Sequence, residues 1–260
     1  MPLIGWIVLF CLLGGVLSAL AAALFLVLKE SHRNHLLPHL VSFATGALLG
    51  AALLGLLPHA LEGLGEADMH VIPMTVLLGL LGFFLLEKMV LWRHCHHDHC
   101  EVHAPSTEVQ RRSTGTMILV GDGLHNFLDG VLIAGAFLTD IHLGVVTSLA
   151  VVAHEIPQEV GDFAVLLHSG FSRRKAMLFN VLSSLTTVVG GVLAYYSLRD
   201  AEVALPYVLA VAASSFIYVA VADLIPGLHK RVEFSATLKQ LLLIGAGVAL
   251  IYATHSTLHT

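Results

Sequence analysis

Long apolar stretches separated by short polar connections make up most of this 260-residue chain. A bilayer core about 30 Å thick requires roughly 20 apolar residues of helix, and each of these stretches approaches or exceeds that length. We therefore expect an all-α, polytopic membrane protein with eight transmembrane helices, at about 3–28, 36–60, 71–92, 114–138, 143–168, 175–197, 203–226 and 236–256. The first stretch follows no basic n-region and no cleavage site, which favours a retained helix over a secretory signal.

The basic residues between the expected helices predict an orientation. With eight helices, 12 of the 13 Lys and Arg residues fall on the same side of the membrane, and Arg199 falls on the other. Cytoplasmic loops are enriched in Lys and Arg, so the richer side is expected to be cytoplasmic and both termini to lie on the non-cytoplasmic side. Residues 1–260 then form a single transmembrane domain with one longer cytoplasmic loop at 93–113.

Composition narrows the function classes. The chain is 57% hydrophobic and 12% charged, with a formal net charge of −5 and 3 cysteines. This balance excludes a disordered tail, a nucleic-acid binder and a disulfide scaffold, each of which needs charge or cysteine that is missing. The 17 histidines are unusual in so apolar a chain and indicate a role with protons or metal ions. No prosthetic group is expected.

Two neighbouring expected helices carry ionisable residues in mid-membrane, where they are costly and functional candidates by default. The fourth helix presents one polar face at helical spacing, formed by Asp122, His125, Asn126 and Asp129. The fifth presents two i, i+4 pairs and one acid a turn later, namely His154 with Gln158, Glu155 with Glu159, and Asp162. Imidazole and carboxylate ligands suit Zn²⁺, and the added amides broaden the set to Fe²⁺ or Mn²⁺.

Three other interpretations compete with a metal path. The facing polar groups are also typical of a network that only joins two helices. His154 and Glu155 begin like the HExxH motif of a metalloprotease, which requires a second histidine where Gln158 stands. A metal-sensing membrane protein without net transport is the third alternative, although no output domain accompanies the helices. Pro157 removes a backbone donor inside the fifth helix and predicts a kink beside His154.

At these residues the sequence resembles the ZIP (Zrt/Irt-like) family of divalent metal transporters. The resemblance covers essentially the whole chain, and HNFLDG at 125–130 and HEIPQE at 154–159 are its most specific parts. The second motif is similar to the HEXPHE motif of the LIV-1 branch, with Gln158 in place of the usual histidine. The resemblance implies a transporter rather than an enzyme, which moves Zn²⁺, with Fe²⁺, Mn²⁺ and Cd²⁺ as further candidates, into the cytoplasm.

The same resemblance implies a two-metal centre between the fourth and fifth helices. One site would use His125, Asp129, His154 and Gln158, and its neighbour would use Asn126, Glu155 and a bridging Asp129. Some members add a carboxylate from the sixth helix, where this chain offers Ser184 or Thr187. The family is also thought to move by an elevator-like motion. Divalent ions and the lipid bilayer are the expected partners, with a homodimer as the assembly to test and a bacterial plasma membrane as the location.

Further metal-ligating residues lie outside the two motifs. The expected cytoplasmic loop contains a tract of seven ligands that suits loose metal binding, or is simply solvated, formed by His94, Cys95, His96, His97, His99, Cys100 and His103. His59 near the outer face and Asp223 near the inner face are expected to be transit ligands, with helix-end capping or snorkelling as the alternative. Asp122, Glu159 and Asp162 complete the pathway candidates.

Overall fold

The computed structural model describes residues 1–64, 70–92, 108–230 and 232–258, and the regular structure in this part of the chain is entirely helical. The first membrane segment joins α1 (Leu3–Leu12), η1 (Leu13–Leu17) and α2 (Ser18–Val27), and the second joins α3 (Glu30–Gly50), η2 (Ala51–Leu56) and α4 (Leu57–Glu62). The remaining elements are α5 (Val71–Trp92), α6 (Glu108–Thr139), α7 (Ile141–His168), α8 (Arg173–Leu198), η4 (Glu202–Ala204), α9 (Leu205–Tyr218), η5 (Val219–Leu224), α10 (Ile225–Leu228) and α11 (Phe234–Leu258).

The all-helical, multi-pass architecture is confirmed. Within the described residues, seven helical stretches are long and apolar enough to cross a membrane. The 28-residue α7 is not among them, because His154, Glu155 and Gln158 lower its hydropathy, yet it packs against α2, α3 and α6 inside the bundle. The number eight and the orientation of the termini stay predictions.

One expected boundary is wrong. The loop predicted at 93–113 overlaps α6, which already begins at Glu108. The segment EVQRR is polar but contains the good helix formers Glu, Gln and Arg, so the helix extends beyond its apolar part. Residues 93–107, with the whole tract of seven ligands, lie outside the described residues.

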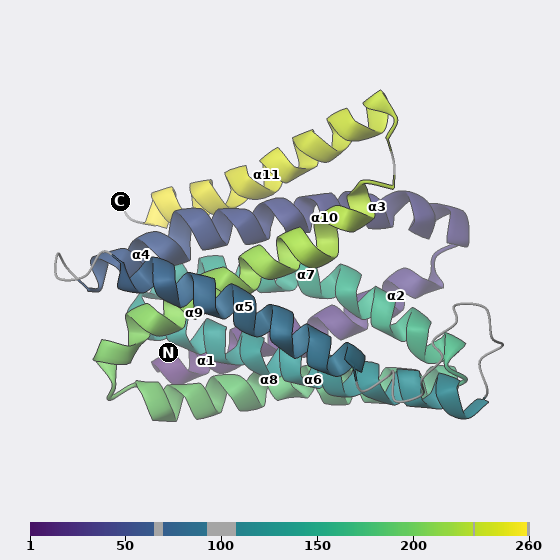
Figure 1. The fold of residues 1–260 in the computed structure, drawn as a ribbon, viewed down its shortest axis with the longest axis horizontal. Coiled ribbons are helices and arrows are strands. Elements are labelled where there is room, and N and C mark those ends of the chain that lie inside the picture. The colour runs from purple at the N-terminus through teal and green to yellow at the C-terminus, as the bar shows by residue number, and fades with distance from the viewer. Residues whose placement is uncertain (65–69, 93–107, 231, 259–260) are drawn as a thin grey trace.

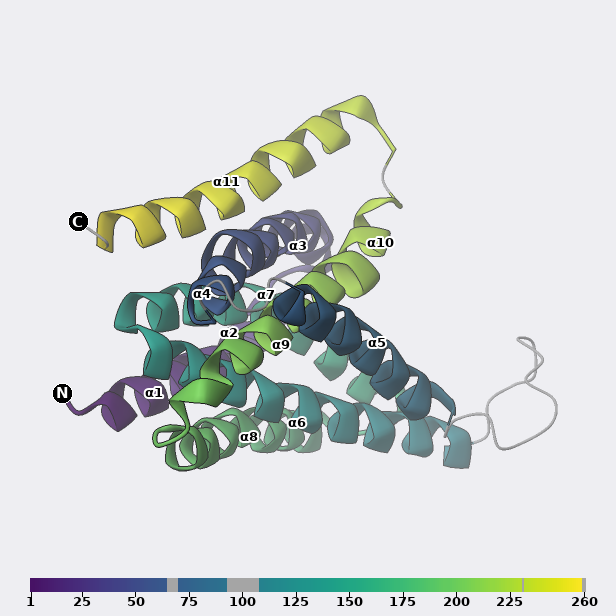
Figure 2. The same ribbon diagram turned by 60° about the vertical axis from the view of Figure 1, so that its left-hand side comes forward.

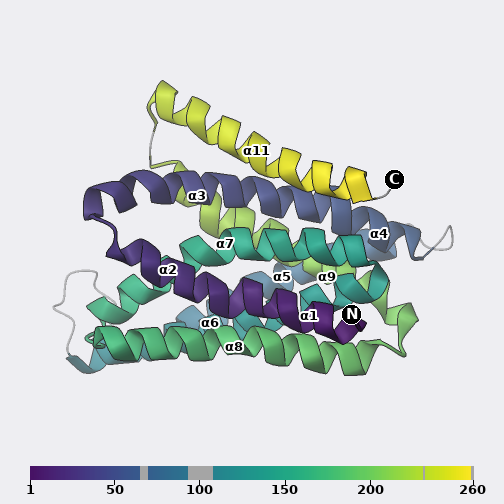
Figure 3. The same ribbon diagram turned by 180° about the vertical axis from the view of Figure 1, so that it is seen from behind.

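The long helices run side by side, and their connections gather at the two ends of the bundle (Figure 1). Both chain ends lie at the same end, with the α6–α7 and α8–α9 connections, and the α2–α3, α7–α8 and α10–α11 connections lie at the other (Figures 1 and 3). The C-terminal helix α11 follows α3 along one edge and diverges from it toward α10 (Figure 2).

Glycines bring α6 and α8 into direct backbone contact. A Cβ placed on Gly130 of α6 would overlap the carbonyl oxygen of Thr187, and one placed on Gly190 of α8 would overlap that of Phe127. Small residues at such crossings replace the hydrophobic driving force that lipid does not supply. This contact holds α8 against the part of α6 that carries Asp122 and Asn126.

Local signals define the two ends of α7. The Asp140 carboxylate caps its first turn by accepting hydrogen bonds from the backbone N–H groups of His142 (2.8 Å) and Leu143 (3.0 Å). Gly170 follows the helix with a φ of 87°, a left-handed conformation that glycine adopts without strain and that commonly ends helices. These signals define both ends of α7. Between them the helix is continuous and contains Pro157.

Candidate metal centre

Four side chains from two helices converge in the middle of the bundle. His125 and Asp129 are one turn apart on α6, and His154 and Glu155 are consecutive on α7. One ligand atom from each residue lies within 4.8 Å of the others. His154, Asp129 and Glu155 are buried, whereas the His125 side chain keeps 21% of its surface exposed. We call this set the four-residue cluster.

Five distances within the four-residue cluster are close to those expected around one tetrahedral ion. The Nε2 atoms of His125 and His154 lie 3.3 Å apart. Glu155 Oε1 lies 3.4 Å from the first and 3.5 Å from the second, and Asp129 Oδ2 lies 3.8 Å and 3.3 Å from them. Donors about 2.0–2.1 Å from a tetrahedral Zn²⁺ would lie about 3.3–3.4 Å from one another. The residues present therefore fit a single Zn²⁺ with two nitrogen and two oxygen ligands.

The His154 ring is oriented for ligation. Its Nδ1 lies 2.9 Å from the carbonyl oxygen of Ala150. A carbonyl only accepts, so Nδ1 carries the proton of the neutral ring and Nε2 directs its lone pair at the cluster. The Phe216 ring of α9 packs edge-on against the imidazole, with 6.0 Å between ring centroids. A backbone bond and an apolar wall thus hold this ligand in place.

The carboxylates of the four-residue cluster lack hydrogen-bond donors. Both oxygens of Asp129 and both of Glu155 are buried without a hydrogen-bond partner among the described residues. A buried carboxylate without donors is strongly disfavoured, because its solvation is lost and nothing replaces it. A divalent cation would supply the missing interaction for both groups at once.

Three further polar side chains of α6 and α7, Asp122, Asn126 and Glu159, are hydrogen-bonded to α8. Ser183 Oγ donates to Asp122 Oδ2 (2.5 Å), and Thr187 Oγ1 donates to Asn126 Oδ1 (2.8 Å). Glu159 accepts hydrogen bonds from the Ser184 hydroxyl (2.7 Å) and from the Asn180 amide (2.5 Å). Asn126 also donates to Asp122 Oδ1 at 2.8 Å. Asn126 and Glu159 therefore face α8 and lie outside the four-residue cluster.

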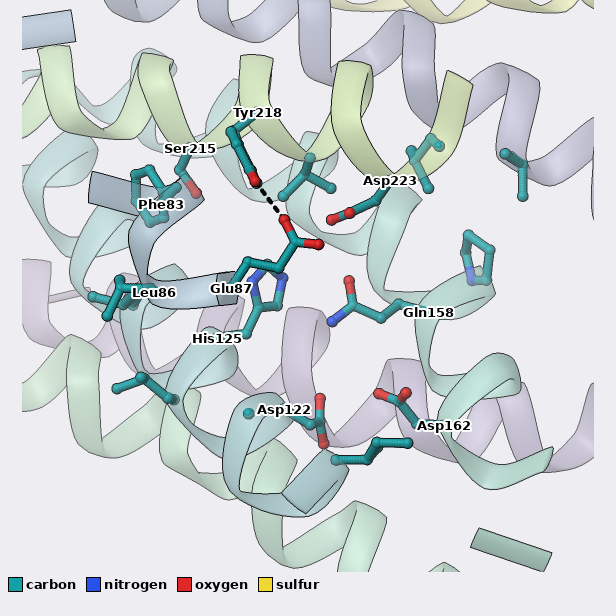
Figure 4. A pocket seen from close by; sticks show the side chains of 18 of the residues that line it. Phe83, Leu86, Glu87, Asp122, His125, Gln158, Asp162, Ser215, Tyr218 and Asp223 are labelled. Atoms are coloured by element: carbon teal, nitrogen blue, oxygen red, sulfur yellow. Dashed lines mark hydrogen bonds between the residues drawn. The ribbon is translucent and has the colours of Figure 1, made fainter. Parts of the chain in front are cut away.

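A cavity of about 480 Å³ begins at His125 and extends toward the end of the bundle that carries the α7–α8 connection. Gln158 of α7 lines this cavity together with His125 (Figure 4). Four carboxylates border the cavity, and three were expected from the sequence: Asp122, Asp162 and Asp223. The fourth is Glu87 of α5, which accepts a hydrogen bond from the Tyr218 hydroxyl of α9 (Figure 4).

Sequence reasoning missed Glu87 because it lies beside Lys88 near the end of an apolar stretch. A carboxylate within the apolar run FFLLEKM was the available signal. His59, expected at the outer face, lies on α4, where its Nδ1 is 2.9 Å from the Gly55 carbonyl oxygen, and it does not line the cavity.

Fold and site together define a class, that of multi-pass membrane proteins with a buried His–carboxylate cluster of metal-ligand geometry. Comparison with known families narrows it: the family model described as "ZIP Zinc transporter" matches residues 3–113 and 93–254. The chain belongs to the ZIP zinc transporter family, and the resemblance seen in its motifs is confirmed.

Individual relatives of the chain are also named zinc transporters. The chain is similar to zinc transporter zipt-7.2 of Caenorhabditis elegans (31% identity over 86% of this chain and 59% of the relative). It is also similar to zinc transporter ZIP13 of Pongo abelii (33% identity over 83% of this chain and 66% of the relative). A third relative is zinc transporter ZIP4 of Homo sapiens (32% identity over 76% of this chain and 39% of the relative). The chain spans less than two thirds of the length of these relatives. They are animal proteins, and the bacterial plasma membrane expected from the sequence finds no support in them.

Proposed function

We propose that this chain transports divalent metal ions, with Zn²⁺ as the principal substrate, into the cytoplasm through the four-residue cluster. The observation that carries the proposal is the set of Nε2 and carboxylate atoms at 3.3–3.8 Å, buried between α6 and α7 of a multi-pass membrane protein. Two imidazoles and two carboxylates suit Zn²⁺ and give a neutral site when the ion is bound. Fe²⁺, Mn²⁺ and Cd²⁺ are the competing substrates to test.

The position of the cavity supports transport of the ion toward the cytoplasm. The cavity extends from His125 toward the end of the bundle where Lys29 lies between α2 and α3 and where Arg173, Arg174 and Lys175 begin α8. Basic connections are typical of the cytoplasmic side. In this proposal α7 also crosses the membrane, which brings the number of membrane helices to eight. Both termini then lie outside, and the cavity is the cytoplasmic exit. The tract at 94–103 is then a cytoplasmic metal-binding loop, and a homodimer stays a prediction.

Transport fits the geometry better than proteolysis. A metalloprotease of the HExxH type holds its metal between two histidines one turn apart and keeps the glutamate as a general base. Here Glu155 is itself within the ligand set, and position 158 is a glutamine that lines the cavity.

The test is Zn²⁺ uptake by proteoliposomes that contain the full chain. We expect the double variant Asp129→Ala, His154→Ala to fall to the rate of protein-free vesicles. His168→Ala is the matched control, because His168 makes the same kind of backbone contact on α7 (2.8 Å to Ala164) but is exposed at its end. It should transport like the parent. Parent-like uptake by the double variant would show that the proposed site is wrong.

Direction requires a separate measurement. In cells that express the chain, a cytoplasmic fluorescent zinc sensor should report a rise after external Zn²⁺ is added, and the double variant should give none. A fall of the cytoplasmic signal in the parent would reverse the proposed direction.

A further inference from the structure

We infer that the centre between α6 and α7 binds one divalent ion per chain, and that Thr187 of α8 determines this number. The inference rests on the proposed function and refines it. It departs from the two-metal centre that the family resemblance implies. Three features of the described residues carry it: the bonding of Asn126, the position of Glu155, and the way the acids are neutralised.

Asn126 is already bonded. An asparagine can ligate a cation only through its side-chain oxygen. That oxygen accepts the hydrogen bond of Thr187 at 2.8 Å, and the amide nitrogen donates to Asp122. Asn126 is fully buried, so this arrangement lies in the interior of the bundle. The residue that would begin a second site is therefore part of a hydrogen-bonded link between two helices.

Glu155 lies with the first set of ligands. By family resemblance it would belong to the second ion, but its Oε1 is 3.4 Å from the Nε2 of His125 and 3.5 Å from that of His154. With Asp129 these residues supply four donors, the usual number for Zn²⁺. The ligand that would serve a second ion completes the first site instead.

The buried acids divide into two groups. Asp129 and Glu155 have no hydrogen-bond donors among the described residues, and one dication balances their charge. Asp122 and Glu159 each accept hydrogen bonds on both oxygens, with Ser183, Asn126, Ser184 and Asn180 as donors. On the α8 side, a second dication at Asn126 would meet the neutral hydroxyl of Thr187 and no carboxylate, because α8 contains no Asp or Glu. Its desolvation would then lack compensation.

Thr187 is also confined. It is fully buried, and a Cβ placed on Gly15 of η1 would lie 2.9 Å from its hydroxyl oxygen. The hydroxyl thus fills the space between η1, α6 and α8. A glutamate here, with its flexible side chain, would bring a third charge to Asn126 and Asp129 and create the conditions for a second ion.

The experiment counts bound ions. The full chain, with the seven His and Cys of the 94–103 tract changed to Ala or Ser, is saturated with Zn²⁺, freed of excess metal on a desalting column, and analysed by elemental mass spectrometry. Asp129→Ala in the same background removes a ligand common to both possible sites, so the difference counts the ions at the centre. We expect a difference of one. A difference of two overturns the inference, and a difference of zero overturns the proposed function itself.

A second variant tests the role of Thr187. Thr187→Glu should raise the difference to two and add a metal–metal distance of about 3.5–4 Å, typical of paired ions, to the X-ray absorption spectrum. Thr187→Val, which has the same shape but no hydroxyl or charge, should keep the count at one. If Thr187→Glu elutes as a folded protein and still binds one ion, Thr187 does not determine the number. If it does not fold, Thr187→Asp, which brings the same charge on a side chain close to threonine in size, takes its place: a count of two supports the role of Thr187, and a count of one overturns it.

Discussion

The Nε2 atom of His154 lies 3.3 Å from Oδ2 of Asp129, although the two residues belong to different helices. This contact makes the ligand set depend on the relative position of α6 and α7. Either helix alone offers two of the four donors, and neither pair suffices for a closed zinc site. A small sliding of one helix against the other would therefore change affinity for the ion, which is what release to a cavity on one side requires.

Asp129→Asn should weaken Zn²⁺ binding severely while it preserves side-chain shape. It removes one of the two charges that balance the ion, and the loss should exceed the roughly 10–100-fold typical of partners outside the ligand shell. Competition with a fluorescent chelator in detergent measures the affinity. Asp200→Asn, with a carboxylate 82% exposed, serves as control and should bind like the parent.

Asn180→Ala should destabilise the protein through Glu159. The carboxylate would lose a donor in a buried place, which costs about 1.5–3 kcal/mol for a charged partner. Thermal unfolding in detergent measures the change. In a Glu159→Gln background the same substitution should cost about 1 kcal/mol, because the partner is then neutral. An equal cost in both backgrounds would mean that Asn180 acts through packing instead.

Gly190→Ala should abolish correct folding. The added methyl overlaps the carbonyl oxygen of Phe127, which is backbone and cannot rotate away, so α6 and α8 must separate. Gly245→Ala on α11, where nothing lies within 4 Å, should be neutral or slightly stabilising because alanine favours helix. Fluorescence-detected gel filtration compares the two, and an equal monodisperse peak from both would contradict the tight crossing.

The double variant Glu87→Gln, Asp223→Asn should raise the KM of Zn²⁺ transport by about two- to fivefold. This is the scale expected when exposed charges are removed. Equilibrium binding at the four-residue cluster should not change. Tyr218→Phe removes the hydrogen bond to Glu87 and should give a smaller effect in the same direction. Glu202→Gln, exposed at the other end of the bundle, is the control. Increased ionic strength should reduce the difference.

Most of the fold was predictable from the sequence because each membrane helix needs a run of apolar residues. The errors lie at polar helix ends, where Glu30 and Glu108 begin helices well before the apolar stretches do. Hydropathy has no means to detect such extensions, since they depend on backbone propensity and not on burial. The polar residues of α7 lower the hydropathy signal that identifies a membrane helix, yet the stretch 143–168 was expected as a helix and α7 forms there.

The candidate ligands were predictable, but their division into sites was not. Helical spacing placed His125 and Asp129 on one face, and the motif placed His154 beside Glu155. Whether Asn126 or Gln158 joins them depends on the rotation of α7 and on what α8 presents opposite. Those are tertiary relationships, and Thr187 as the partner of Asn126 has no local signature. Glu87 had a local signal, a carboxylate within an apolar run, but its partner Tyr218 lies on a distant helix and could not be predicted.

The π-helical turn η5 has a consequence for the register of the helix formed by α9, η5 and α10. In an α-helix, Tyr218 and Asp223 would point about 140° apart, because five residues overshoot one turn. In a π-helix five residues span nearly one turn, and both side chains border the cavity. If deletion of Ala220 restored α-helical winding, Tyr218 and Asp223 would be four residues apart and only about 40° apart around the helix axis, so both would still face the cavity. The π-helical turn thus accommodates one surplus residue and keeps the two halves of this helix in register.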